Sequence, residues 1–201
     1  MKINVSQMTG KLKNIPAINT NPLTNTFCKA MSSCGNKSII CTKCYSCAML
    51  KTYRRNCVPA FERNSIALTD KDLADDDLPT IKKNDIVRIH AHGELIDGTH
   101  LNNILRIVKK NDTKMFSLYT KRKELIDAEF SKSAKPDNLI LVYSNPQIDA
   151  PITNVPPHFD KVFNVVRVTN LDKINCGANN CNGCRRCYDK TKENIIYEMI
   201  K

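Results

Sequence analysis

Ten cysteines lie in two clusters near the two ends of the chain, and no other feature of the sequence restricts its fold as strongly. Six lie within residues 27–57 and four within residues 176–187. The opening MKINVSQMTGKLKN is basic but lacks the apolar run of a secretory signal, so we expect the protein to stay in a reducing cytoplasm. Cysteines in that compartment are expected to bind metal or to do redox chemistry rather than to form structural disulfides.

The four C-terminal cysteines have a spacing typical of iron–sulfur ligands, C-x4-C-x2-C-x2-C. A structural zinc site usually takes two C-x2-C pairs far apart in sequence, or mixed Cys and His ligands. Successive two-residue gaps instead match the C-x2-C-x2-C run of ferredoxins. We therefore expect a [4Fe-4S] cluster rather than zinc, with the ligands Cys176, Cys181, Cys184 and Cys187.

The N-terminal cluster contains more cysteines than one metal centre can use. Its six members are Cys28, Cys34, Cys41, Cys44, Cys47 and Cys57. Cys47 and Cys57 fall where helices are expected, and a free cysteine there packs as a small hydrophobe. The expected ligands are therefore Cys28, Cys41 and Cys44. The two cysteine runs either serve two clusters or fold together around one, and the sequence leaves both possibilities open.

Between the cysteine clusters, apolar stretches typical of strands alternate with stretches of helical periodicity. Strands are predicted at residues 86–91, 114–120, 138–144 and 161–168, and helices at 44–53, 59–68, 100–111 and 122–130. This alternation predicts parallel β–α units, whose ligands bind at the carboxyl ends of the strands. Because a complete eight-stranded barrel needs about 250 residues, the chain is expected to form a single α/β domain with a partial or irregular barrel-like parallel sheet. The first quarter is expected to form loops, and the cysteine-rich segments 27–57 and 176–187 to fold over one end of the sheet.

One predicted strand, IVRIHAH, alternates polar and apolar residues, although a strand buried in a parallel sheet is normally apolar on both faces. Its polar residues are Arg88, His90 and His92. Either the strand lies at a wet edge of the sheet, or these side chains look into a polar site. A second strand ends in Thr120 and Lys121, a pair suited to binding an anion.

Two carboxylates follow the histidines of this strand in the stretch HGELID, namely Glu94 and Asp97. Together with His90 and His92 they are the candidate catalytic residues, because two carboxyl groups beside a histidine can divide general acid and general base roles. Hydrolysis of a glycoside would require such a pair on either side of one bond. The alternative is a solvated loop in which Asp97 and Gly98 form a turn.

The formal net charge of +11 raises the possibility of a nucleic-acid partner. The basic residues are scattered, however, and two bound clusters of about −2 each would lower the charge to about +7. The chain also lacks the aromatic pattern of RNA-binding sheets and the spacing of zinc fingers. A small molecule or carbohydrate is the preferred partner, and no apolar run is long enough to make a membrane a partner.

The order of several short motifs resembles the bacteriophage gene product 88 family. The motifs are Cys28, Cys44-Tyr45, VRIHAHGELIDGTHL, LYTK and INCGANNCNGCRRCY. Gly93-Glu94 stands where the family has Gly-Asp, which keeps a carboxylate. The resemblance implies a phage or prophage protein in the cytoplasm of a bacterial host, distantly similar to enzymes that use S-adenosylmethionine and a cluster held by three cysteines. Those enzymes use C-x3-C-x2-C, which this chain lacks, so the resemblance implies iron–sulfur binding on a β/α scaffold more strongly than radical chemistry.

Three functions follow from these observations. The preferred one is a redox or radical-type enzyme with one or two [4Fe-4S] clusters, with Arg88, Thr120 and Lys121 as cofactor-binding residues and S-adenosylmethionine as the cofactor that the resemblance implies. The second is a hydrolase in which the cluster is structural. The third is a nucleic-acid-binding protein held together by metal.

Overall fold

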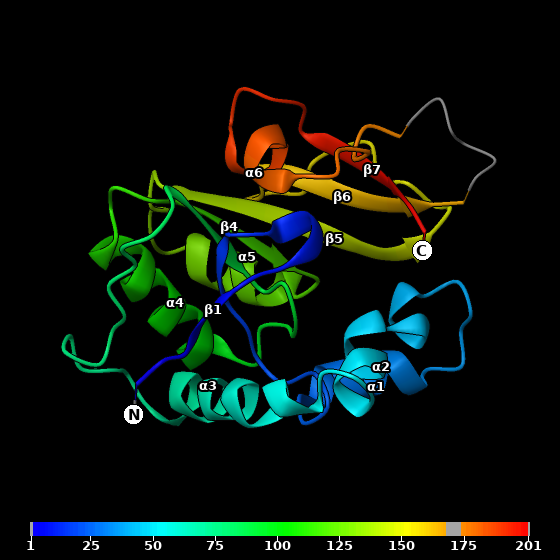
Figure 1. The fold of residues 1–201 in the computed structure, drawn as a ribbon. Coiled ribbons are helices and arrows are strands. Elements are labelled where there is room, and N and C mark those ends of the chain that lie inside the picture. The colour runs from blue at the N-terminus through cyan, green and yellow to red at the C-terminus, as the bar shows by residue number, and fades with distance from the viewer. Residues whose placement is uncertain (1, 168–173, 201) are drawn as a thin grey trace.

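A seven-stranded sheet forms the centre of the computed structural model, which describes residues 2–167 and 174–200 (Figure 1). The strands pair in sequence order, with β1 antiparallel to β2 and each later pair parallel. They are β1 (Val5–Gln7), β2 (Pro16–Ile18), β3 (Ile86–Ile89), β4 (Met115–Thr120), β5 (Leu139–Ile148), β6 (Lys161–Val166) and β7 (Ile195–Met199). The prediction of one α/β domain with a mostly parallel sheet is confirmed.

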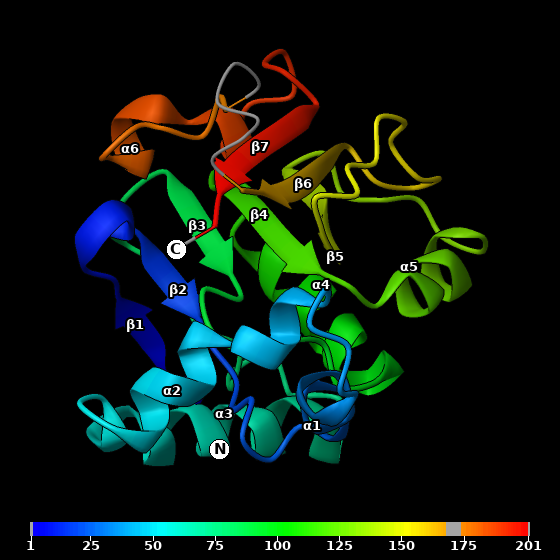
Figure 2. The ribbon, with the colours of Figure 1, turned by 90° about the vertical axis from the view of Figure 1, so that its right-hand side faces the viewer.

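The helices lie on different sides of this sheet. Figures 1 and 2 show α3 (Val58–Asp70), α4 (Gly98–Lys110) and α5 (Lys123–Phe130) on one face. The short α6 (Cys181–Cys184) lies over the other face, and α1 (Thr26–Ser33) and α2 (Tyr45–Lys51) lie to one side of the sheet. Short 3-10 turns at Gly10–Leu12, Ile40–Lys43, Arg55–Cys57 and Arg186–Tyr188 join these elements. Among the described residues, no helix is both long enough and apolar enough to cross a bilayer.

The main core fills the space between the sheet and α3 to α5. Val87 and Ile89 of β3 and Phe116 and Leu118 of β4 are fully buried in it. Side chains alternate between the two faces along a strand, so Arg88, which lies between Val87 and Ile89, belongs to the opposite face. β3 lies between β2 and β4, so the edge-strand explanation for the alternating pattern is wrong. Its polar residues instead come from a strand inside the sheet.

The predicted central strands and helices are all present, with their ends shifted by a few residues. Val168, at the end of the predicted 161–168 strand, lies outside the described residues. β5 runs through Pro146 to Ile148, where its pairing with β6 becomes irregular between Ser144 and Ile148. An irregular pairing is where a strand tolerates proline, which has no N–H to donate.

The prediction that the first quarter forms only loops is wrong. It contains β1, β2 and α1, and β7 near the C-terminus was also not predicted. The two N-terminal strands have three residues each, too few for an alternating pattern to be recognised. They form because β2 pairs with the already buried β3. The pairing therefore depends on tertiary structure rather than on local sequence.

We expect the Asn103→Ala variant to lose about 2–4 kcal/mol of unfolding free energy, because it would leave several buried backbone groups without partners. The Asn103 amide donates to the backbone oxygens of Leu68 and Lys71, at 3.0 Å and 2.8 Å, and accepts from Leu73 N at 2.9 Å. These bonds attach the end of α3 to α4. Urea unfolding followed by circular dichroism measures the loss.

The matched control is Asn102→Ala on the same helix, which removes one exposed hydrogen bond to Asp72. We expect it to cost less than about 1 kcal/mol. Equal losses for the two variants would contradict this account of the junction between α3 and α4.

Candidate functional site

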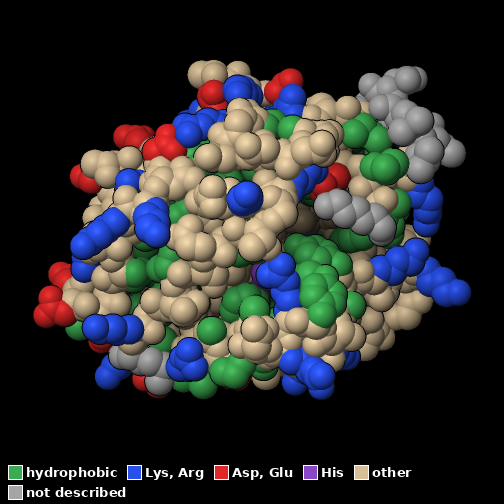
Figure 3. All heavy atoms as spheres, in the orientation of Figure 1, with side chains coloured by type: hydrophobic (Ala, Val, Ile, Leu, Met, Phe, Trp, Pro, Cys, Tyr) green, Lys and Arg blue, Asp and Glu red, His purple; other side chains and the backbone are tan. Residues whose placement is uncertain are grey.

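A cavity of about 550 Å³ lies over the sheet face opposite α3 to α5. Arg88 of β3, Tyr119 of β4 and Phe163 of β6 form its floor. The two cysteine-rich segments form its walls, one from each end of the chain. Figure 3 shows a recess on this side of the molecule with basic side chains at its border. The segments expected to fold over one end of the sheet therefore both contribute to one cavity.

The N-terminal cysteines gather beyond the carboxyl ends of β3 and β4. Cys28 lies in α1, Cys41 in a 3-10 turn and Cys44 immediately before α2, and all three line the cavity. Cys47 lines it as well, and Cys34 and Cys57 are not among its lining residues. The expected ligands Cys28, Cys41 and Cys44 are thus brought to the same wall.

Burial makes two of these thiols hard to ionise. It raises the pKa of Cys28 to about 12 and also raises the pKa of Cys41. Cys44 differs, because hydrogen bonds from the Cys47 thiol and from the backbone amides of Cys47 and Ser46 lower its pKa. One thiol of this wall is therefore the preferred site of negative charge.

Glu94 and Lys121 stand beside these thiols. The Glu94 carboxylate is buried and accepts hydrogen bonds from Thr120 Oγ1 at 2.5 Å, Lys121 N at 2.9 Å and Leu95 N at 2.9 Å. Burial by itself would lower the pKa of Lys121, but the negative charges of Cys41 and Glu94 raise it overall. Thr120 supports Glu94 and does not line the cavity. Arg88 and Lys121, the other two expected cofactor-binding residues, do line it.

The two candidate catalytic histidines also border the cavity. His92 shares a 2.9 Å hydrogen bond with Ser46 Oγ and stacks on Phe61, with ring centroids 5.6 Å apart. Burial lowers the pKa of His92 to about 4 and that of His90 to about 3, so both imidazoles are neutral near pH 7. The ring of His90 packs edge-on against His100, with both of its nitrogens buried and without a hydrogen-bond partner among the described residues.

Asp97 is not brought into this site. Its carboxylate accepts from His100 N at 2.8 Å and caps the N-terminus of α4, and it is not among the residues that line the cavity. The alternative expectation of a solvated loop is also wrong for Glu94, which is only 4% exposed. The stretch HGELID therefore supplies one buried carboxylate to the site and one helix cap.

The C-terminal cysteines surround a second, much smaller hollow. Cys176, Cys181, Cys184 and Cys187 all line a space of about 20 Å³ that also touches Lys11 and Tyr188. Burial raises the pKa of Cys176 and of Cys187, and that of Cys181 to about 11. The Tyr119 hydroxyl donates to Cys187 Sγ at 2.7 Å, and Lys11 Nζ lies 3.6 Å from Cys176 Sγ. All four expected C-terminal ligands thus border one space.

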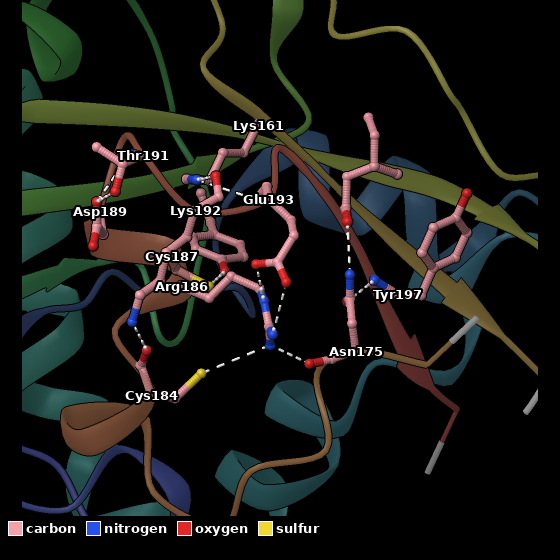
Figure 4. A network of polar contacts seen from close by, with 12 residues as sticks. Lys161, Asn175, Cys184, Arg186, Cys187, Asp189, Thr191, Lys192, Glu193 and Tyr197 are labelled. Carbon is pink, nitrogen blue, oxygen red and sulfur yellow. Dashed lines mark hydrogen bonds and ion pairs between the residues drawn. The ribbon is translucent and has the colours of Figure 1, made fainter. Parts of the chain in front are cut away.

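A network of polar contacts holds the C-terminal cysteine segment in place (Figure 4). Arg186 pairs with Glu193 at 2.8 Å, donates to Asn175 O and lies 3.8 Å from Cys184 Sγ. Lys192 Nζ donates to Cys184 O at 2.7 Å, and the buried Lys161 Nζ donates to the backbone oxygens of Lys192 and Glu193. Two basic side chains therefore contact Cys184 itself.

The cysteine thiols are ligands that suit a soft metal centre. Their side chains are not arranged as a finished metal site, however. Among residues 2–167 and 174–200, no three His, Cys, Asp or Glu side chains form a ready-made metal group. Thiols are nevertheless the ligands that iron–sulfur clusters use, and four of them border one hollow. Within each run, neighbouring thiols raise one another's pKa.

Sequence reasoning missed the sheet residues that connect the two sets. The Tyr119 hydroxyl donates a hydrogen bond to Cys187 Sγ, and the guanidinium carbon of Arg88 lies 3.1 Å above the Tyr119 ring centroid. Ser144 Oγ contacts Lys121 Nζ at 3.1 Å. A signal existed for Tyr119, which lies two residues before Lys121 on one strand and thus on the same face. The pairing of Arg88 with Ser117, which places Arg88 on that face too, was not visible in the sequence.

Comparison with known proteins gives one match. The model of the family described as Gene product 88 matches residues 3–190, which is nearly the whole chain. No curated protein and no solved structure gives a match.

We expect Gly93→Ala to disturb the site. Gly93 joins His92 to Glu94 in a backbone conformation with positive φ, which other residues rarely adopt. Its φ is 94°, and a Cβ there would lie 2.5 Å from Thr20 O and would also overlap the Thr20 hydroxyl. We expect a loss of about 2–4 kcal/mol of unfolding free energy, measured by urea unfolding.

Gly98→Ala is the control. Gly98 begins α4, and a Cβ there meets nothing within 4 Å. We expect this variant to be neutral or slightly stabilised. A Gly93→Ala variant as stable as Gly98→Ala would show that the turn is not constrained in this way.

Proposed function

The chain belongs to the gene product 88 family, and from this premise and the two cysteine sets we propose that it is an iron–sulfur redox protein. Cys176, Cys181, Cys184 and Cys187 hold one [4Fe-4S] cluster. Cys28, Cys41 and Cys44 hold a second one on the opposite wall of the cavity. The observation that carries the proposal is that four thiols with ferredoxin-like spacing border one hollow.

The basic side chains around the C-terminal thiols support this proposal. Lys11 and Arg186 lie within 3.6 Å and 3.8 Å of cysteine sulfurs. Both cations also pair with carboxylates, Lys11 with Glu198 and Arg186 with Glu193. A thiolate-ligated cluster carries net negative charge, which cations so close to the sulfurs would offset. Tyr119 donates its hydroxyl hydrogen to Cys187, as groups around cluster sulfurs do when they tune a reduction potential. Tyr188 is buried beside the same hollow and excludes water from it.

The N-terminal set supports a different role, because it lines the large cavity at the carboxyl ends of the strands, beside Glu94 and Lys121. When bound, such clusters supply one-electron transfer, and one held by three thiolates offers a metal position to an external ligand. The resemblance to enzymes that use S-adenosylmethionine makes that molecule the candidate external ligand. Glu94 and Lys121 place one carboxylate and one ammonium beside these thiols, and the Lys121 ammonium can orient a molecule that enters the cavity.

The hydrolase alternative receives no support from the arrangement of carboxylates. Glu94 and Glu198 are the carboxylates among the described residues that line the cavity. Glu94 is committed to three hydrogen bonds, and Glu198 pairs with Lys11 at 2.8 Å. A pair of free carboxyl groups on either side of a substrate bond, which glycoside hydrolysis requires, is not formed by these residues.

We expect the anaerobically purified protein to contain about eight irons and eight acid-labile sulfides per chain. Cys184→Ser should remove about four of each and destabilise residues 176–187, because metal-binding free energy is also folding free energy. Cys44→Ser should remove the other four. Chemical iron and sulfide assays with electron paramagnetic resonance before and after reduction measure these losses.

Cys34→Ser is the matched control, since Cys34 is exposed and borders neither hollow. It should keep the full iron content. About four irons per chain, lost together in Cys44→Ser and Cys184→Ser, would mean that both sets fold around one cluster. Zinc without sulfide in the wild-type protein would overturn the proposal.

A further inference from the structure

Arg88 is a largely buried cation in the cavity floor without a carboxylate partner. Its Nε donates to His90 O at 3.2 Å, and its guanidinium carbon lies 3.1 Å above the centre of the Tyr119 ring. It forms no ion pair with any carboxylate of the described residues. Burying a charge without a partner costs free energy, so a buried charged side chain is usually paired with an opposite charge in the functional state of the protein.

Lys121 adds a second cation to the same face. It lies two residues beyond Tyr119 on the chain, and its Nζ contacts Ser144 Oγ at 3.1 Å. Its nearest acidic neighbour is Glu94, whose oxygens are already engaged by Thr120, Leu95 and the Lys121 backbone. The ammonium lines the cavity beside Glu94 and Cys41, whose negative charges raise its pKa, and it can meet an anion that enters there.

Among the described residues no hydrogen bond joins Arg88 to a cysteine, although its positive charge favours ionisation of Cys181 and Cys187. Tyr119 stands between Arg88 and Cys187, because its ring face meets the guanidinium while its hydroxyl meets Cys187 Sγ at 2.7 Å. Lys11 and Arg186 already lie next to the C-terminal sulfurs. Charge compensation of that cluster is thus also supplied from the other side of the hollow.

The remaining floor and wall suit the uncharged part of a ligand. Phe163 packs edge-on against Tyr119, with ring centroids 5.5 Å apart, and Val165 lies beside it in the lining. His90 contributes a neutral imidazole whose two buried nitrogens have no partner among the described residues. A volume of about 550 Å³ is typical of a site for a small organic molecule.

We propose that this cavity binds a small organic anion, with its carboxylate or phosphate group against Arg88 and Lys121 and its apolar body against Phe163 and Val165. Arg88 presents a planar fork that matches either group. The proposal goes beyond iron–sulfur binding and does not depend on it, since the cations and the apolar floor belong to the sheet.

The test is titration of the anaerobically purified full-length protein with 1-naphthyl phosphate, 1-naphthoate and the uncharged 1-naphthol, followed by naphthyl fluorescence. At least one of the two anions should bind about tenfold more tightly than 1-naphthol. Whichever anion binds identifies the phosphate or the carboxylate as the preferred group. Arg88→Gln should weaken that binding about tenfold, and Arg88→Lys should weaken it less.

Arg63→Gln, which removes the same charge from an exposed position of α3, should leave binding unchanged. If Arg88→Gln fails to fold by circular dichroism, Lys121→Met takes its place with the same expected loss. Binding of 1-naphthol as tight as that of both anions, or equal binding by Arg88→Gln and Arg63→Gln, would overturn the proposal.

Iron assays on the same samples separate this proposal from the iron–sulfur one. Arg88→Gln protein that loses iron but binds the anion normally would assign Arg88 to the cluster and refute the anion site. Wild-type protein that binds the anion but holds no iron would leave the anion site standing and refute the iron–sulfur proposal.

Discussion

A parallel sheet has two faces that must both be covered, and in this protein long helices cover only one of them, while the other carries the four-residue α6. The face toward α3 to α5 is closed by a continuous apolar core. The other face is covered by the two cysteine-rich segments, which contact the sheet with far fewer apolar side chains. The cavity and both thiol sets exist because this second covering is incomplete.

This division explains why the middle of the sheet is polar. β3 and β4 send Val87, Ile89, Phe116 and Leu118 into the core, and their alternate residues necessarily reach the other side. Arg88 and Tyr119 are such residues, and Lys121 follows β4 directly. A fully packed second layer would have buried the charges of Arg88 and Lys121 at high cost. The cavity leaves the two cations next to open space, and the anion that we propose would pair with them there.

The two thiol sets differ in a way that fits different tasks. The C-terminal set borders the small hollow beside Tyr188 and Lys11, and three of its four cysteines also line the large cavity. The N-terminal set lies at the carboxyl ends of β3 and β4, where ligands of parallel sheets bind, and lines only the large cavity. A centre with a small hollow of its own suits electron transfer, whereas one at the carboxyl ends of the strands suits contact with a bound molecule. The space between them is where the proposed anion lies.

The sequence by itself determined the central β–α units, because their apolar periods of two and 3.6 residues are local properties of the chain. It also determined that Cys41 and Cys44, and likewise Cys181, Cys184 and Cys187, lie close together, since two-residue gaps are local as well, but it left open whether the two runs share one cluster. Only the tertiary structure decided that β2 joins β3, that Asp97 caps a helix while Glu94 is buried, and that Arg88 lies over Tyr119. These outcomes depend on strand register and on contacts between residues far apart in the chain, which no local pattern encodes.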